Sequence, residues 1–159
     1  MPNHCFNRVE FYSNDKEEEI KKLHDIFSID VQAQDEERTI FGQFIPEPDW
    51  TNTPLMSSDV KGTVYDRGKV GELPMPDGTF QSTGRHDDRW YDWRIQNWDT
   101  KWDCYDVVVT DDDPDQLEVE FNTAWSPPEA ICNEIREQYP DLAVSWFYAE
   151  PGCEIAGYL

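Results

Sequence analysis

Two segments of this 159-residue chain alternate hydrophobic and polar residues, and a helical pattern follows each of them. Residues 4–12 and 117–123 repeat with the two-residue period of a strand, which predicts strands with one buried face. Residues 15–27 carry apolar side chains at helical spacing, and a second helix is predicted between Ser126 and Tyr139. Two strand–helix pairs of this kind predict a sheet whose helices lie on one face.

Each predicted helix has a candidate capping residue at its start. Asn14, with Glu17 three residues later, matches a capping box for the first helix. Ser126 precedes Pro127 and Glu129, a pattern in which serine caps, proline takes the first helical position and glutamate closes the box. We therefore expect both helices to be capped by polar side chains adjacent in sequence.

The remaining regular segments complete an α+β fold. Strands are predicted at residues 38–45, 104–110 and 142–150, with an edge strand at 153–158, and a short helix follows Trp90. The order is then β-α-β, an insertion, and β-β-α-β-β. Two split β-α-β units on one antiparallel sheet form a ferredoxin-like sandwich, with two helices on one face and the other face partly open.

Residues 46–89 differ from the rest of the chain. They contain five prolines and five glycines but few clustered aliphatic residues. We expect a variable, loop-rich insertion, with a short hairpin near residues 63–70, inside a single ferredoxin-like domain of residues 1–159. Loops of this length are commonly functional.

Several short motifs resemble a known family. They are Met1-Pro2-Asn3, Cys5 and Asn7, then Trp90-Tyr91-Asp92-Trp93-Arg94, Asn97-Trp98 and Thr100-Lys101-Trp102, and finally Thr123-Ala124-Trp125-Ser126-Pro127-Pro128, Gly152 and Ala156-Gly157. Over residues 1–45 and 90–159 the chain resembles the small ferredoxin-like proteins of phages and plasmids, the YubB-like family. His4 and Asp99 stand where that family more often has Trp and Gly. The resemblance implies a fold and a mobile-element origin, and it transfers no catalytic residue.

The chain is strongly acidic. It has 34 Asp and Glu residues against 13 Lys and Arg, a formal net charge of -21. Residues 90–159 hold sixteen of these acidic residues and only three of the basic ones. Such a field repels nucleic acid and anionic membranes and favours basic protein surfaces. The alternative is that the charge serves solubility alone.

The acidic residues concentrate around a predicted turn at residues 111–115 and the strand that follows it. The candidate partner-binding residues are Asp111, Asp112, Asp113, Asp115, Glu118 and Glu120. Closely spaced carboxylates can mimic phosphates and occupy Arg and Lys side chains that otherwise hold DNA. Two alternatives are a solvated turn that protects a sheet edge and a Ca²⁺ or Mg²⁺ loop, although the ligand spacing of an EF-hand is missing.

A tryptophan-rich segment offers a second candidate site. Its aromatic rings and polar side chains would wall a pocket for a nucleotide or another flat ligand, and the residues are Trp90, Trp93, Arg94, Asn97, Trp98, Lys101 and Trp102. Aromatic residues at helical spacing are also typical of a core, so the rings can instead pack against the sheet.

No catalytic, cofactor-binding or metal-binding motif is present in the sequence. There is no nucleophile elbow, phosphate-binding glycine loop or dinucleotide fingerprint, and no short-spaced His and Cys pair that would hold zinc. We therefore predict no cofactor. The four widely separated cysteines, the absence of a signal peptide and the absence of about 20 consecutive apolar residues favour the reducing cytoplasm of a bacterial host.

These observations favour a non-enzymatic binding protein of a phage or similar element. Its predicted partner is a basic host protein, a nucleic-acid-binding or defence factor that an acidic mimic of DNA would inhibit. It is expected to contact neither nucleic acid nor membranes directly. Two other hypotheses stay open: a small-ligand binder or enzyme built on the tryptophan-rich pocket, and self-association through the open sheet face.

Overall fold

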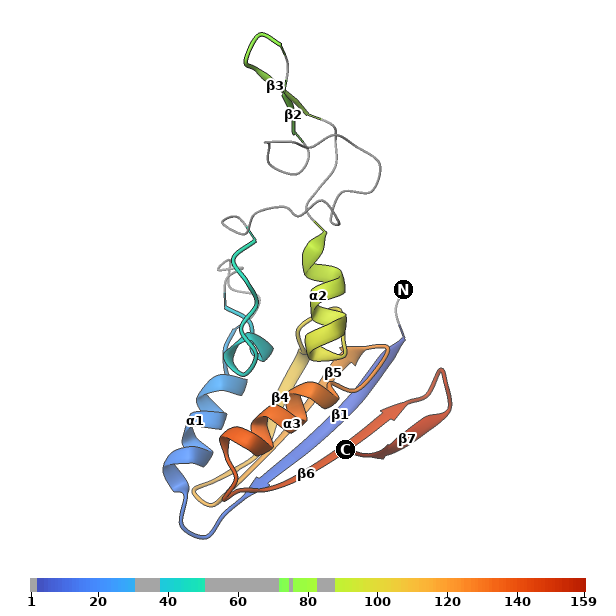
Figure 1. Cartoon of the computed structure of the whole chain (residues 1–159). Helices are drawn as coiled ribbons and strands as arrows, with labels where there is room; N and C mark the ends of the chain where they lie inside the picture. Colours follow the sequence, from blue (N-terminus) through green and yellow to red (C-terminus); the bar gives the residue numbers. More distant parts are fainter. Residues whose placement is uncertain (1–2, 31–37, 51–71, 75, 83–87) are drawn as a thin grey trace. The chain divides into compact units, whose positions relative to one another are not determined.

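The structure, a computed structural model, describes residues 3–30, 38–50, 72–74, 76–82 and 88–159 (Figure 1). The chain divides into two compact units. The sheet unit comprises Met1–Pro46 and Arg94–Leu159, and the insertion unit comprises Glu47–Trp93. Among the described residues, no helix is long and apolar enough to cross a membrane.

In the described residues of the sheet unit, the regular structure consists of five strands, three α-helices and one 3-10 helix. They are β1 (His4–Tyr12), α1 (Glu17–Phe27), the 3-10 helix η1 (Phe41–Gln43), α2 (Arg89–Trp98), β4 (Tyr105–Asp113), β5 (Gln116–Ala124), α3 (Glu129–Gln138), β6 (Ala143–Glu150) and β7 (Ile155–Tyr158). Helix α2 begins in the insertion unit and ends in the sheet unit.

The strands form one sheet in the order β4-β5-β1-β6-β7, with every neighbouring pair antiparallel. Helix α1 connects towards β4 and helix α3 connects β5 to β6, so the two β-α-β units are split and interleaved. Figure 1 shows α1 and α3 lying against the same side of the sheet. This is the α+β ferredoxin-like sandwich that the sequence predicted, with β7 added at one edge.

The core lies between the sheet and these two helices. Along β1 every second residue is buried, which places Val9 and Phe11 inwards and confirms the alternation. Phe121 of β5 lies at the centre, with ring centroids 5.9 Å from Phe27 and 5.6 Å from Trp146. Aromatic pairs of this geometry add about 0.5–1.5 kcal/mol each beyond the area they bury.

One buried polar side chain crosses this core. The Asn7 amide nitrogen donates to the Cys5 carbonyl and to Thr123 Oγ1, each at 3.0 Å. Trp146 Nε1 donates to Asn7 Oδ1 at 3.1 Å. Because buried polar groups are costly unless they are hydrogen-bonded, this amide is stable only with all three partners in place.

The predicted strand at residues 38–45 is wrong, because this segment contains the helix η1. Ile40, Phe41 and Phe44 are buried together, a spacing that suits a helical turn better than a strand. The turn is held from a distance: Asp103 accepts hydrogen bonds from the amides of Ile40 at 2.7 Å and Phe41 at 2.9 Å. The second strand of the first β-α-β unit is therefore β4.

Both predicted helix caps are also wrong. Helix α1 begins after Lys16 without a side-chain cap, and α3 begins after Pro128. The first turn of α3 is capped by Asp99, whose Oδ2 accepts the amide of Ala130 at 2.7 Å. Ser126 Oγ instead donates to the carbonyl of Asp99. For α3, a residue about 30 positions earlier therefore supplies the contact that the local motif predicted, whereas α1 has no side-chain cap.

The β4–β5 hairpin is tighter than the sequence suggested. The predicted acidic turn at residues 111–115 is wrong for Asp111 to Asp113, which belong to β4 and pair with β5. Only Pro114 and Asp115 form the turn. Register shifts around Asp106 and Thr110 interrupt the pairing of β4 with β5, and irregularities of this kind discourage further strands from pairing with an edge.

The described part of the insertion unit contains a two-stranded hairpin of β2 (Glu72–Pro74) and β3 (Phe80–Ser82). Gly78 lies in the connecting turn with a φ of 84°, a conformation that favours glycine. The hairpin predicted near residues 63–70 lies outside the described residues. The helix predicted after Trp90 is α2, and it is confirmed.

Candidate partner-binding face

The side of the sheet opposite α1 and α3 forms an open face. In an antiparallel pair, directly opposed residues share a face. The outward residues of β1 include Phe6, Arg8, Glu10 and Tyr12, which alternate with the buried ones. The cross-strand partners of these four residues define the open face on β5 and β6.

Three carboxylates form a row across the open face. Glu10 on β1 is directly opposite Glu118 on β5, and Glu118 is directly opposite Asp111 on β4. Neighbouring strands lie about 4.8 Å apart, so the row presents three carboxylates on three adjacent strands. Glu120 lies on the same face, opposite Val108 of β4 and Arg8 of β1. We call Glu10, Asp111, Glu118 and Glu120 the acidic row.

The crowding of these carboxylates affects their protonation. The hydrogen bond that Glu10 shares with Glu118, with smaller contributions from burial and from the Glu118 charge, raises the pKa of Glu10 above its usual 4.5. The hydroxyl of Thr110 donates to Glu118 Oε1 at 2.6 Å and lowers the pKa of Glu118. As pH falls, Glu10 therefore takes up a proton before Glu118 does.

The other half of the open face is aromatic. Phe147 of β6 is opposite Arg8 on one side and Tyr158 of β7 on the other. The rings of Phe147 and Tyr158 meet edge to face, with centroids 5.4 Å apart. The guanidinium of Arg8 lies 5.7 Å from the centroid of Phe147, and Tyr158 is 69% exposed. We call Phe147 and Tyr158 the aromatic pair.

The structure separates the six acidic residues that the sequence grouped. Four of them lie on the open face, because each is directly opposite another residue of that face on a neighbouring strand: Asp111, Asp113, Glu118 and Glu120. Asp112 is opposite the buried Leu117, and its carboxylate lies 3.4 Å from His24 Nε2 on α1. Asp115 lies in the turn, where its carbonyl accepts the amide of Ser13.

Sequence reasoning missed Glu10 as a member of the row. The alternation along residues 4–12 does place it on the outward side of β1. Its position beside Glu118 follows only from the pairing of two strands that are more than 100 residues apart in sequence.

The tryptophan-rich segment divides between the two units. Trp98 is fully buried in the sheet unit, packs against Phe41 and donates its Nε1 to the Ile45 carbonyl at 3.0 Å. The Arg94 guanidinium lies 4.8 Å from the Trp98 ring centroid. Trp98 is therefore a core residue, which agrees with the packing alternative.

The other members of the segment lie apart from this core position. The Lys101 Nζ lies 4.3 Å from the centroid of the Trp102 ring, and this ring meets Tyr105 edge to face. Trp90 packs on Tyr91, and Trp93 packs on Trp50 within the insertion unit. Asn97 lies in α2 of the sheet unit and is half-buried. Each described ring thus has its own neighbours within its unit.

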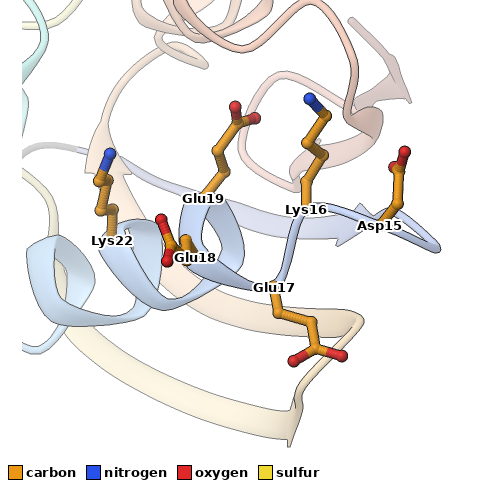
Figure 2. A pocket seen from close by; sticks show the side chains of 6 residues that line it. All are labelled: Asp15, Lys16, Glu17, Glu18, Glu19 and Lys22. Carbon is orange, nitrogen blue, oxygen red and sulfur yellow. The ribbon is translucent and has the colours of Figure 1, made fainter.

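A hollow of about 450 Å³ lies at the start of α1. It is lined by Asp15, Lys16, Glu17, Glu18, Glu19 and Lys22, and Figure 2 shows Glu17 pointing away from Lys16, Glu19 and Lys22. Lys16 pairs with Asp141 at 3.2 Å. Acidic residues in a first helical turn interact favourably with the helix dipole, so stabilisation of α1 accounts for this cluster.

The cysteines of the sheet unit are mostly internal. Cys5, Cys104 and Cys132 are buried and unpaired, while Cys153 is exposed. Burial raises the pKa of Cys5 to about 11 and keeps it a thiol at neutral pH. Within the described part of the chain, no group of three or more His, Cys, Asp and Glu side chains is arranged to hold a metal ion.

Comparison with a protein-family model supports the fold. Residues 97–159 match the family model described as the ferredoxin-like domain in Api92-like protein. A solved structure, the protein Api92 from Yersinia pseudotuberculosis, is similar over 99% of this chain and 93% of that chain, with 11% sequence identity and a TM-score of 0.49. No curated protein matches the chain. The family match includes β4 to β7, and therefore most of the sheet.

Proposed function

We propose that this chain is a non-enzymatic binding protein of a phage or similar mobile element, and that its open face docks on a basic surface of a host nucleic-acid-binding protein. The observation that carries the proposal is the acidic row. Three adjacent strands each contribute a carboxylate to one line, on the side of the sheet that α1 and α3 leave uncovered. The resemblance to phage and plasmid proteins supplies the biological setting.

The charge density of the row suits a protein that normally holds nucleic acid. Carboxylates on neighbouring strands repeat at about 4.8 Å, and one DNA strand carries a phosphate for every 3.4 Å or so of helix axis. A surface adapted to phosphates therefore meets a similar line of negative charge on the open face. Arg8 is the one Lys or Arg among the residues that the structure pairs on this face.

The net charge of the whole chain favours the same kind of partner. At -21 the chain repels nucleic acid itself, while a basic protein is attracted over the Debye length of about 8 Å at physiological salt. Complementary fields of this kind speed encounter and exclude acidic competitors. Binding of this chain would displace nucleic acid from the partner, which is the expected action of an anti-defence inhibitor.

The test compares two variants of identical net charge. The face variant carries Glu10→Gln, Glu118→Gln and Glu120→Gln, and the control variant carries Glu17→Gln, Glu18→Gln and Glu137→Gln on exposed helix positions. Each immobilised protein is used to capture bacterial proteins, and duplex DNA is then added as a competitor. We expect wild type and control to retain a basic protein that DNA displaces, and the face variant to lose it.

The result that would contradict the proposal is equally specific. Equal capture by the face and control variants would mean that overall charge, and not the open face, attracts the partner. Capture that duplex DNA does not reduce would exclude mimicry of DNA.

A further inference from the structure

We infer that the open face selects arginine over lysine, so that its occupant is an arginine-rich segment of the basic partner. This inference rests on the proposed function and specifies its chemistry. It starts from the fact that the uncovered sheet face combines two surfaces, the acidic row on β4, β5 and β1 and the aromatic pair on β6 and β7.

The two surfaces meet in one continuous line of residues across the sheet. Val108, Glu120, Arg8, Phe147 and Tyr158 are successive cross-strand neighbours from β4 to β7. Arg8 occupies the place between the Glu120 carboxylate and the Phe147 ring, and the exposed Tyr158 ring follows Phe147 at the end of the line. The carboxylates attract both basic side chains, and the aromatic rings distinguish between them.

Arg8 already shows how a guanidinium fits the junction. Its guanidinium carbon lies 5.7 Å from the Phe147 centroid, within the range of a cation–π contact. The charge of Arg8 also contributes to the lowered pKa of Glu118 and partly offsets the rise in the pKa of Glu10. One guanidinium therefore interacts with a ring of β6 and with carboxylates of β1 and β5 at the same time.

Lysine fits this surface less well for two physical reasons. The guanidinium is planar and weakly hydrated, so it stacks on a ring while its edge donates two parallel hydrogen bonds to a carboxylate. The ammonium of lysine is compact and strongly hydrated, and it loses more solvation when it lies against a ring. The acidic row attracts both cations, and the aromatic pair favours the guanidinium.

A second copy of the same chain is a poor occupant. Two copies each carry a net charge of -21 and repel one another, and the chain has only 13 Lys and Arg residues against 34 Asp and Glu. A basic partner segment has the complementary charge. The occupant is therefore another protein, recognised through several arginines.

The experiment uses the full chain and two synthetic peptides of equal length and charge, one alternating Arg with Ala and the other Lys with Ala. Affinities are measured by fluorescence anisotropy at low and at physiological salt. We expect the arginine peptide to bind roughly threefold more tightly, because the exposed Tyr158 ring can stack one guanidinium of the peptide while Arg8 already lies over Phe147. Phe147→Leu with Tyr158→Leu should abolish the preference, and Tyr91→Leu, an exposed aromatic of the insertion unit, should leave it intact.

Each other outcome has a definite meaning. Equal binding of the two peptides to wild type would overturn the arginine selectivity while leaving an acidic docking face in place. An arginine preference that survives in the double variant would also overturn the inference, since the aromatic pair would not be its source. No binding of either peptide at low salt would overturn the inference and contradict the proposed function as well. Circular dichroism of each variant confirms that the sheet is intact.

Discussion

Asp99 serves two helices at once, and substitutions there should separate its two contributions. Its φ of 61° places it in the left-handed region directly after the last residue of α2, and its carboxylate caps α3 through the Ala130 amide. Loss of a capping acceptor costs about 1 kcal/mol. A residue such as alanine, which rarely adopts a left-handed conformation, costs about 1 kcal/mol more.

These magnitudes rank three variants. Asp99→Ala loses both contributions, about 2 kcal/mol, whereas Asp99→Gly loses the cap but adopts the left-handed conformation freely, about 1 kcal/mol. Asp99→Asn keeps an acceptor and the tolerance for positive φ, and it loses about 0.5 kcal/mol of charge–dipole interaction. In a chain of this size, 1 kcal/mol shifts Tm by about 2–4 °C. The expected decreases in Tm are then about 4–8 °C, 2–4 °C and 1–2 °C.

The assay is thermal unfolding followed by circular dichroism, with hydrogen exchange of the Ala130 amide as a local measurement. All three substitutions remove or weaken the same hydrogen bond, so exchange at Ala130 should rise most for alanine and glycine. Equal Tm values for the alanine and glycine variants would refute the backbone contribution. An alanine variant that melts with wild type would refute the capping role altogether.

Four further predictions concern the buried carboxylate and the open face. Asp103→Ala leaves the amides of Ile40 and Phe41, at the start of η1, without an acceptor and should cost about 2–4 kcal/mol in urea unfolding. Burial raises the pKa of Asp103, so the contribution of this carboxyl to stability is largest below its usual pKa of 3.8 and falls as pH rises through the folded-state pKa. The free energy of unfolding of Asp103→Asn, measured relative to wild type, should therefore be more favourable at neutral pH than in acid. Glu118→Ala should lower the pKa of Glu10 in a carboxyl NMR titration, and an unchanged pKa would show that their hydrogen bond is absent. Arg8→Gln should strengthen binding of the arginine peptide by roughly threefold, because it frees the Phe147 ring for a guanidinium of the partner.

The fold could be predicted well where a local pattern determines the structure. Alternation identified β1 and β5, and helical spacing identified α1 and α3. Sequence-based prediction failed at residues 38–45, where β-branched and aromatic residues suggested a strand. The segment forms η1 because Asp103, about 60 residues away, accepts its amides and because its apolar residues are buried on one side.

The helix caps show the same limit of local reasoning. A capping box at Ser126 is a sound local expectation, but the hydroxyl of Ser126 contacts the Asp99 carbonyl and the Asp99 carboxylate caps α3. No sequence pattern near Ser126 reports a residue nearly 30 positions earlier.

The candidate site was predictable in its chemistry but not in its membership. Acidic composition pointed to the β4–β5 hairpin, and four of the six predicted residues lie on the open face. Asp112 turned inwards beside His24, and Glu10 joined the row from β1. Both results depend on strand pairing and on the irregular register of β4, which tertiary structure alone determines.

Asn7 links the interior of the sheet to the geometry of its outer surface. A slip of β1 by one residue would bring Arg8 and Glu10 into the apolar layer and expose Val9. It would also separate the Asn7 amide from Thr123 and Trp146, its hydrogen-bond partners on the two neighbouring strands. The buried Asn7 carboxamide thus fixes the register of β1 against both neighbouring strands. That register in turn sets the positions of the charged side chains on the open face, although Asn7 itself is buried.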